Sequence, residues 1–328
     1  MRRTNVTGVA LITVMLVVAL AAIIATQMLA RLQLQVQRTT NINFNQQAYW
    51  YAMGAEAFAK RVLFTAFNKE KDTTHLGQVW AQGKTTYPVD YGEISGEITD
   101  LQACFNLNAL RTPPENGSAN KKAPSRVAFE KLIVALNLEG VDNFEAEYMA
   151  DALSDWLDAD TSIVSAGGAE DNDYAAKEFP YYPANNYLVS VNELRVIEHF
   201  SIEVINALKE HVCIIPNSNL YQVNVNTISQ ETPEILQAML SMSREDAEQA
   251  LSAKEQDGFK DIKEFFELPE ISKLKMTEDQ KQRFVVDSEY FKLKATANFN
   301  NSYFQLNSTL YVADNNKISV ISRTIGRD

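Results

Sequence analysis

The chain has 328 residues, of which 46% are hydrophobic, and its formal net charge is −12. This length allows two or three domains, and the hydrophobic content is sufficient for a folded core. The acidic balance argues against nucleic acid and anionic membrane surfaces as main partners, because both are themselves negatively charged.

An apolar segment begins close to the N-terminus. Residues 9–25 contain a single polar side chain, Thr13. A helix that continues to Ala30 is long enough, at about 1.5 Å per residue, to span a hydrocarbon core of roughly 30 Å. A secretory signal would have a shorter apolar region and a small-residue cleavage site after it. Because Arg2 and Arg3 precede the segment, the positive-inside rule places the N-terminus in the cytoplasm and the chain after residue 30 outside.

The remainder of the chain predicts an α+β fold. No Pro interrupts the apolar segment and its continuation, so residues 9–65 are expected to form one long helix. Alternating apolar and polar residues predict strands in 87–110 and 289–325, and turns at Asn300-Asn301 and Asp314-Asn315-Asn316 divide the second segment into two or three antiparallel strands. The block between these segments has mainly helical periodicity, as in residues 127–138, 145–157, 191–200 and 234–242. An antiparallel sheet with a large inserted α-helical domain follows, and the linker 111–125 marks where the insert starts.

The strongest chemical signal is the acidic segment DWLDADTSIVSAGGAEDND, residues 155–173. It contains no Lys or Arg and six carboxylates, which are Asp155, Asp158, Asp160, Glu170, Asp171 and Asp173. Such charges repel one another unless a hard cation neutralises them, and Ca²⁺ accepts 6–8 oxygen ligands in irregular geometry. Gly167 and Gly168 would let the chain fold back, so that Glu170 and Asp171 face Asp158 and Asp160. The segment is not an EF-hand, because Ile163 and Ala169 occupy the Gly and Glu positions of that loop. The residues alone allow two interpretations of this segment, a calcium site or a solvated acidic loop.

The chain has two cysteines, Cys104 and Cys213. Cys104 lies at the end of a predicted strand and Cys213 at the end of a predicted helix of the insert. Outside the inner membrane the compartment is oxidising, so we expect a disulfide between them rather than two buried thiols. It would tie the insert to the sheet and stabilise the fold by roughly 2–4 kcal/mol.

One segment of the insert suggests an alternative function, DNA binding. Residues 223–227, VNVNT, open a segment that resembles the helix-hairpin-helix of membrane-anchored, competence-type DNA receptors. The hairpin position (240–246) has no Gly, and residues 223–268 hold ten Asp or Glu against four Lys or Arg. Phosphate binding needs cations and free backbone amides, so no nucleic acid is expected, and Asn224 and Asn226 are expected to cap or bridge turns instead.

An enzyme is not expected either. The three His do not form metal-ligand pairs, and no nucleophile-elbow, phosphate-loop, zinc-protease or dinucleotide motif is present. Asp155 and Asp158 could be taken as a catalytic pair of carboxylates. They belong, however, to a cluster of six carboxylates, and such a cluster fits a hard ion better.

The basic leader that ends in Gly8, followed by VALITVMLVVAL, resembles the class III signal of type IV pilins and type II secretion pseudopilins. The resemblance implies that prepilin peptidase cuts between Gly8 and Val9 and methylates the new N-terminus. This family usually has Glu at the fifth mature position, which is Thr13 here. The K family, the largest minor pseudopilins, characteristically lacks that Glu. In the other members the Glu is thought to pair with the N-terminal ammonium of a neighbouring subunit.

The segments CFNLNAL and DWLDAD...GGAED also resemble the K pseudopilins, whose pilin fold is interrupted by a large α-domain. The resemblance implies a leader (1–8), a long helix (9–65), the first part of the pilin-like domain (66–110), an inserted α-domain (111–285) and C-terminal strands (286–328). It favours structural calcium, one or two ions, in the acidic loop. It further implies an inner-membrane anchor with a periplasmic domain, contact with minor pseudopilins I and J and the major pseudopilin, and a place at the pseudopilus tip.

Overall fold

The computed structural model describes residues 7–112, 122–300, 302–313 and 316–326, and for residue 7 it describes the backbone only. Residues 1–6 of the predicted leader therefore lie outside the described residues. So do Asn301, Asp314 and Asn315 of the predicted turns and most of the 111–125 linker.

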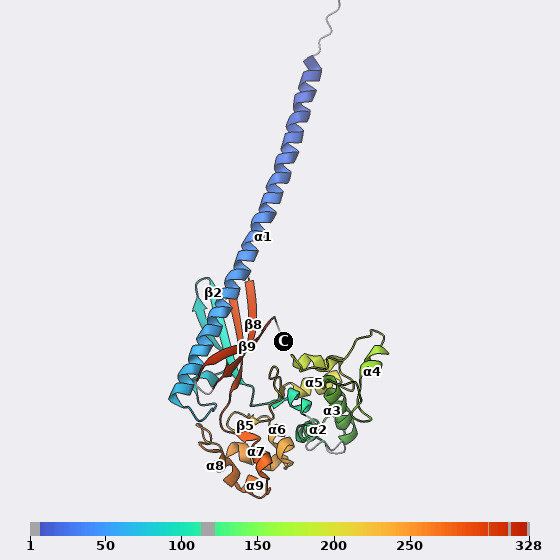
Figure 1. Ribbon diagram of the computed structural model, residues 1–328. Helices are drawn as coiled ribbons and strands as arrows, with labels where there is room; N and C mark the ends of the chain where they lie inside the picture. The colour runs from blue at the N-terminus through green and yellow to red at the C-terminus, as the bar shows by residue number, and fades with distance from the viewer. Residues whose placement is uncertain (1–6, 113–121, 301, 314–315, 327–328) are drawn as a thin grey trace, which may run out of the picture.

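One long helix precedes a sheet that is interrupted by a helical insert (Figure 1). The helix is α1 (Thr7–Lys69), and a short 3₁₀ helix, η1 (Val79–Ala81), follows it. The antiparallel five-stranded sheet has the order β1 (Thr85–Val89), β2 (Gly92–Asp100), β7 (Tyr290–Phe299), β8 (Ser302–Val312) and β9 (Ile318–Ile325). The helices between β2 and β7 are η2 (Leu107–Arg111), α2 (Pro124–Ala135), α3 (Asn143–Leu157), α4 (Asp171–Ala175), η4 (Val191–Val196), α5 (Ile202–Leu208), α6 (Glu234–Leu240), α7 (Arg244–Ser252), α8 (Ile262–Glu267), α9 (Pro269–Ser272) and α10 (Glu278–Lys281). Two parallel two-stranded pairs complete the insert, β3 (Phe105–Asn106) with β4 (Val212–Cys213) and β5 (Val223–Asn224) with β6 (Phe284–Val285).

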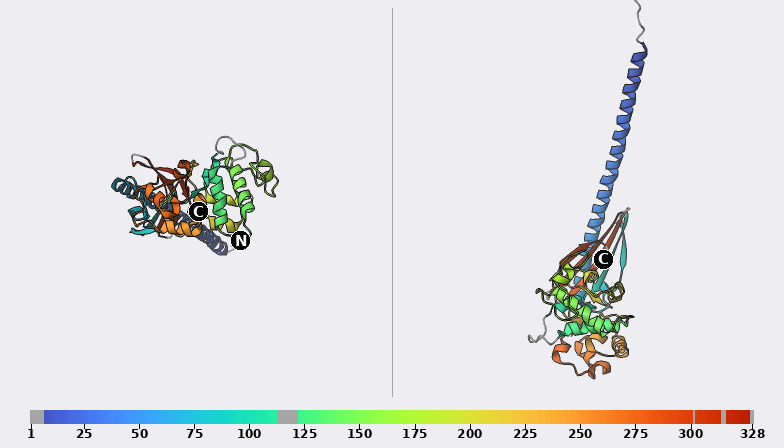
Figure 2. Two further views of the ribbon diagram at one scale, coloured as in Figure 1. Left: turned by 90° about the horizontal axis from the view of Figure 1, so that it is seen from below. Right: turned by 90° about the vertical axis from the view of Figure 1, so that its right-hand side faces the viewer.

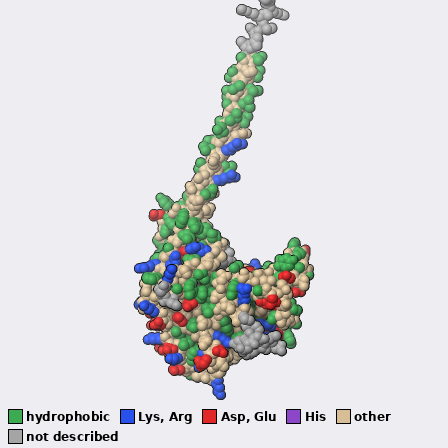
Figure 3. All heavy atoms as spheres, viewed as in Figure 1, with side chains coloured by type: hydrophobic (Ala, Val, Ile, Leu, Met, Phe, Trp, Pro, Cys, Tyr) green, Lys and Arg blue, Asp and Glu red, His purple; other side chains and the backbone are tan. Residues whose placement is uncertain are grey.

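The N-terminal half of α1 projects away from the rest of the molecule (Figure 2) and is covered with hydrophobic atoms (Figure 3). Within the described residues, α1 is the one helix long and apolar enough to cross a membrane, with a mean hydropathy of 2.9 in its most apolar window. Thr13 fits this setting because its hydroxyl donates to the carbonyl of Ala10 (2.9 Å). The helix backbone therefore satisfies the only polar side chain in residues 9–25.

The C-terminal half of α1 packs on one face of the sheet. Its buried residues include a set that recurs every three or four positions, as helical periodicity requires, and this set is Ala48, Ala52, Ala55, Ala59, Leu63 and Ala66. Most of them are Ala, so the helix can lie close to the strands. The facing side chains come from alternate positions of the strands and include Ile98, Phe291, Leu293, Ala295, Ala297, Leu306 and Leu310.

An ion pair between a buried Glu and an exposed Arg fixes α1 to the last strand. Glu56, which is 2% exposed, accepts hydrogen bonds from Arg323 Nε (2.7 Å) and Nη2 (2.9 Å) of β9 and from Ser308 Oγ (2.7 Å) of β8. Burial opposes ionisation of this carboxyl, but the hydrogen bonds from Arg323 and Ser308 outweigh it and lower the pKa of Glu56. The Arg323 side chain is 45% exposed, but its guanidinium pairs with the buried carboxylate of Glu56 and so connects β9 to α1.

The insert has its own hydrophobic core, separate from the core under α1. The predicted helices at 127–138, 145–157 and 234–242 correspond to α2, α3 and α6. The prediction for 191–200 is only partly right, because a 3₁₀ helix of six residues forms there. The end of the predicted strand segment 87–110 is wrong. Asn106 Oδ1 accepts from the N–H of Asn108 (3.3 Å), which stops the strand and starts η2.

A buried hydrogen-bond network joins the insert to the sheet at Asp100, the last residue of β2. Its Oδ2 accepts from Thr227 Oγ1 (2.5 Å) and Ser288 Oγ (2.6 Å), and its Oδ1 accepts from the N–H of Gln102 (2.7 Å). Burial raises the pKa of Asp100 to about 6, because these hydrogen bonds offset only part of the cost of burying charge. The network connects the end of β2, the insert and the approach to β7.

The two asparagines of VNVNT bridge turns, as the sequence predicted. Asn224 Nδ2 donates to the carbonyl of Thr74 (3.0 Å) and to Ser288 Oγ (2.8 Å). Asn226 exchanges hydrogen bonds with the backbone of Phe259, at 2.9 Å from its Nδ2 and 2.7 Å to its Oδ1. Both side chains are buried and serve the packing of the insert.

The hairpin formed by α6 and α7 also packs within the insert. Its turn contains Ser241 with a φ of 57°, and the hydroxyl of Ser241 accepts from Lys131 Nζ (2.5 Å) of α2. At the other end of α6, Glu234 pairs with His211 and with Arg244. The hairpin turn is therefore engaged by a neighbouring helix.

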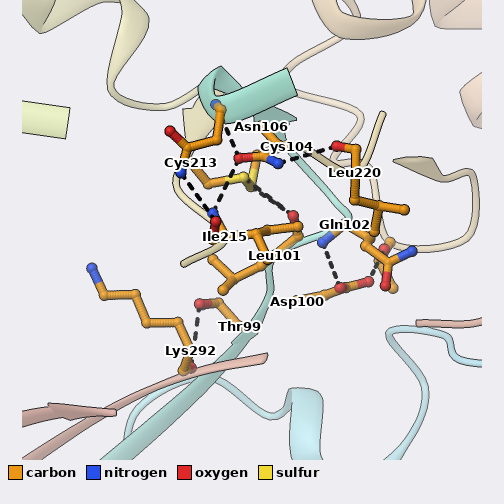
Figure 4. Close-up of a disulfide and its surroundings, with 12 residues drawn as sticks. Thr99, Asp100, Leu101, Gln102, Cys104, Asn106, Cys213, Ile215, Leu220 and Lys292 are labelled. Atoms are coloured by element: carbon orange, nitrogen blue, oxygen red, sulfur yellow. Dashed lines mark hydrogen bonds between the residues drawn. A yellow bond between two sulfur atoms is a disulfide. The ribbon is translucent and has the colours of Figure 1, made fainter. Parts of the chain in front are cut away.

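Cys104 and Cys213 form the expected disulfide, with a Cα–Cα distance of 5.8 Å (Figure 4). Cys213 lies in β4 rather than at the end of a helix, because β4 pairs with β3 directly after Cys104. Leu101 and Ile215 pack beside the bridge. The disulfide therefore connects the insert to the sheet at the same junction as the hydrogen-bond network at Asp100.

Removing the disulfide should weaken this junction. We expect the Cys104→Ser, Cys213→Ser double variant to lose about 2–4 kcal/mol of unfolding free energy, because the bridge closes a loop of 109 residues. Urea unfolding with and without reductant measures the loss. Reductant should destabilise the unaltered chain and leave the double variant unchanged; an unaltered chain that is insensitive to reductant would contradict the expectation.

Candidate metal site

The acidic loop follows α3, whose C-terminal end positions the first carboxylates. A capping box at Asp142 and Glu145 starts this helix, and Asp158 forms its C-terminal cap. Asp158 Oδ1 accepts from the N–H of Asp160 (3.2 Å), and Asp160 Oδ1 accepts from the N–H of Ser162 (2.8 Å). These local hydrogen bonds curl the chain directly after the helix.

Three of the six predicted carboxylates come together. One oxygen each of Asp158, Asp160 and Glu170 lies within 4.8 Å of the others. Asp160 is exposed, Asp158 is half-buried and Glu170 is buried. Carboxylate oxygens of this kind are the ligands that Ca²⁺ and other hard cations prefer.

The other three carboxylates have different places. Asp155 is fully buried beneath the cluster, and its Oδ1 accepts from the N–H of Val164 (3.0 Å). Asp173 Oδ2 accepts from the N–H of Glu170 (2.9 Å) and so caps α4 instead of joining the cluster. Asp171 is the first residue of α4 and is outside the group of three, although its charge acts on Glu170.

Several buried oxygens at the site have no hydrogen-bond partner among the described residues. They are Oδ2 of Asp155 and both carboxylate oxygens of Glu170. Buried polar groups in folded proteins are nearly always paired, so these oxygens have free capacity to bind a ligand. The unpaired atoms are all acceptors, which fits a cation.

The electrostatics of the site point in the same direction. Burial raises the pKa of Asp155 to about 7, and the charges of Glu170 and Asp158 add to this effect. Burial likewise raises the pKa of Glu170 to about 7, with Asp158, Asp171 and Asp160 contributing repulsion. Without a counter-charge, therefore, ionising these carboxyls at neutral pH costs free energy.

The two glycines of the loop are required by space. A Cβ on Gly168 would lie 2.2 Å from Asp155 Oδ2, and a Cβ on Gly167 would lie 2.5 Å from the Cα of Tyr148. They bring Glu170 back to Asp158 and Asp160 as predicted, whereas Asp171 remains outside the group.

Two residues that hold the loop were missed by the sequence reasoning. Asp151 is fully buried in α3 and pairs with the guanidinium of Arg126 of α2 and with the hydroxyl of Ser165 of the loop. The ring of His199 forms a hydrogen bond with the carbonyl of Gly167 (3.1 Å). The signal for Asp151 was its position one helical turn before Asp155. Nothing local in the sequence pointed to Arg126 or His199.

Two family models match this chain, both described as type II secretion system protein K. The first covers residues 103–217, which include the acidic loop, and the second covers residues 223–287, which include the α6–α7 hairpin. The chain belongs to the type II secretion system protein K family.

Relatives within this family match over nearly the whole chain. The type II secretion system protein K of Aeromonas hydrophila is 36% identical, and the match covers 97% of each chain. That of Klebsiella pneumoniae is 33% identical over 92% of this chain and 91% of its own length.

The family fold is also found in a crystal structure titled as the GspK-GspI-GspJ complex from the enterotoxigenic Escherichia coli type 2 secretion system. One chain of that structure matches with a TM-score of 0.78 and 30% identity, over 89% of this chain and 100% of the other. The long apolar helix, the antiparallel sheet and the helical insert are therefore those of a pseudopilin of the K family.

The fit around Gly168 can be tested by adding a methyl group. We expect Gly168→Ala to destabilise the fold by about 1–3 kcal/mol, because the added Cβ forces Asp155 or the loop to move. Gly54→Ala is the matched control, since nothing lies within 4 Å of a Cβ there and Ala is a better helix former than Gly. Thermal or urea unfolding measures both. Equal effects of the two substitutions would contradict the packing described for Gly168.

Proposed function

We propose that this chain is a minor pseudopilin that assembles with the I and J minor pseudopilins at the tip of the type II secretion pseudopilus. There it primes assembly of the pseudopilus and limits its growth, supporting export of folded proteins through the outer membrane. The observation that carries the proposal is the match, over 100% of the other chain, to a chain of the GspK-GspI-GspJ complex. The role is structural and involves no catalysis.

Two features of the chain support a place at the tip. The insert lies beside the sheet, at the end of α1 that is away from its apolar half (Figure 1). Its bulk would obstruct a further subunit on the side away from the membrane. Thr13 stands where other pseudopilins have Glu, and its hydroxyl bonds within its own helix. A subunit with no earlier neighbour needs no carboxylate at that position, because an unpaired charge in lipid is costly.

The apolar half of α1 would anchor the chain in the inner membrane, with the sheet and the insert in the periplasm. The disulfide supports that location, because disulfides persist in oxidising compartments. Cleavage by prepilin peptidase between Gly8 and Val9 would remove the two leader arginines and leave the helix as an assembly element. The major pseudopilin would then follow this chain in the fibre.

The acidic loop would hold structural calcium. Asp158, Asp160 and Glu170 would supply oxygens to an ion, and Asp155, with its unpaired Oδ2, lies beneath them. The ion would supply the positive charge that the cluster lacks. The chain's own residues keep the loop in place through Asp151, which pairs with Arg126 and Ser165.

Calcium should therefore determine the stability of the insert. We expect chelator to lower the melting temperature of the unaltered chain, and added Ca²⁺ to restore it, because the ion binds the folded loop and not the unfolded chain. Asp155→Asn should reduce this calcium-dependent gain. In chelator at pH 8, however, the same variant should be more stable than the unaltered chain, because it no longer buries a charge.

The sign of the pH dependence follows from the raised pKa values. Carboxyls of the unfolded chain ionise near pH 4, whereas those of Asp155 and Glu170 ionise near 7 in the metal-free fold. Between about pH 4 and pH 7 the folded chain thus binds more protons than the unfolded chain does. The contribution of these groups to the free energy of unfolding therefore falls as pH rises through this range. Melting curves of the unaltered chain and Asp155→Asn in chelator measure the difference. A melting temperature of the unaltered chain that does not change when chelator is added would reject the calcium proposal.

The assembly proposal has a separate test. Full-length chain in detergent should co-purify with the I and J pseudopilins of the same secretion system at defined stoichiometry. A single-pass membrane protein of similar helix length is the control for detergent-driven association. Recovery of the chain without either partner would count decisively against a role in that complex.

A further inference from the structure

The outer edge of β9 is an unpaired strand edge. Among the described residues, β9 is the last strand of the sheet, and no backbone hydrogen bond joins its outer side to another segment. The opposite edge strand, β1, is five residues long and contains Pro88, which blunts it against pairing. β9 has eight residues, no Pro and a sequence, ISVISRTI, in which four residues are Ile or Val, so it is longer and more open to pairing than β1.

The register shows which backbone groups face outward. The N–H of Gly326 donates to Gln305 of β8 (3.1 Å), so Thr324 and Ser322 are also in hydrogen-bonded pairs with β8. The backbone groups of Arg323 and Ile325 then point away from the sheet.

The same reasoning applies beyond the irregularity in the register at Thr309/Leu310. The N–H of Ala313 donates to the carbonyl of Lys317 (3.1 Å), which places the backbone groups of Ile318 and Val320 outward. The edge thus offers four residues with free N–H and C=O groups, which are Ile318, Val320, Arg323 and Ile325.

Side chains give this edge two different faces. Ile325 and Val320 pair with Leu306 and Leu310, which face α1, so they lie on the apolar side of the sheet. Ile325 is nevertheless 69% exposed. On the other side, Ser322 and Thr324 line a cleft of about 730 Å³ between the sheet and the insert.

The insert forms the far wall of this cleft. Val189, Ser190, Lys209 and Glu210 line it opposite the strands, and Val189 is 77% exposed. An extended segment placed beside β9 would direct alternate side chains toward the apolar side and into the cleft. The chemistry of the edge therefore selects an extended polypeptide in which apolar and polar residues alternate.

We propose that the outer edge of β9 receives an extended segment of an I- or J-type subunit as a sixth strand of the sheet. This inference rests on the proposed assembly with those subunits. These subunits are the partners in the GspK-GspI-GspJ complex, one chain of which this chain matches. The ion pair between Glu56 and Arg323 holds β9 beside α1, so a partner that packed along α1 would reach this edge.

Amide hydrogen exchange on the full-length chain in detergent tests the proposal directly. Exchange in the peptide that spans residues 318–326 is compared for the chain alone and for the complex with I and J. We expect the amides of Ile318, Val320, Arg323 and Ile325 to exchange at least about tenfold more slowly in the complex, because each gains a hydrogen bond. Peptides from β1 serve as the internal control and should not change.

A backbone substitution separates strand pairing from side-chain contact. Ile325→Pro removes an outward N–H without removing a bond to β8, and we expect it to weaken the complex at least about tenfold. Ile325→Ala keeps the N–H and should bind within about threefold of the unaltered chain. An unchanged melting temperature shows that each variant is folded, and the exchange measurement does not depend on the variants.

The outcomes distinguish this inference from the assembly proposal. A complex that forms while exchange in residues 318–326 stays unchanged overturns the edge pairing alone. Protection that appears in the isolated chain and grows with its concentration identifies a second copy as the occupant and also overturns it. If no complex with I or J forms, both the edge pairing and the assembly proposal are rejected.

Discussion

The structure depends on how a large insert is joined to a small sheet. The chain leaves the sheet after β2 and returns at β7, and both connections meet at the carboxylate of Asp100, which accepts from Thr227 and Ser288. A buried carboxylate is costly unless its oxygens are satisfied, so the three segments must stay together. The disulfide between Cys104 and Cys213 closes the same junction covalently. The position of the insert relative to the sheet, and with it the cleft beside β9 and the direction of the acidic loop, follows from this junction.

The long helix α1 serves two environments with one continuous backbone. Residues 9–25 are apolar on all sides except for Thr13, which suits lipid. The second half of the helix places Ala on a single face, which suits close packing on strands. The change occurs without a break in the helix, so one continuous helix connects the apolar segment to the sheet. The hydrogen bonds between Glu56 and Arg323 hold the last strand to this helix, so in the proposed complex the edge of β9 and the membrane helix would lie on one surface.

Electrostatic repulsion explains the acidic loop. Asp155 and Glu170 are buried with oxygens that no described residue satisfies, while Arg126 is used by Asp151 and is not available to them. This arrangement is what supports the proposal that a cation balances their charge. The proposed calcium ion and the hydrogen bonds of Asp151 have different tasks, since the ion would neutralise the carboxylates and Asp151 holds the loop against α2.

Local physics explains what the sequence by itself determined. Apolar composition and length identified the anchor, period-two and helical patterns identified β7, β8, α2, α3 and α6, and the clustering of carboxylates identified the acidic loop. The same patterns misplaced the end of the strand segment at Asn106 and the setting of Cys213, because a side-chain cap and a two-residue parallel pairing leave no periodic signal. Only the tertiary structure decided which carboxylates meet, that Glu56 pairs with Arg323, and that β9 is left with an open edge. Each of these depends on residues far apart in the chain, and their contacts are set by how the helix, the sheet and the insert pack.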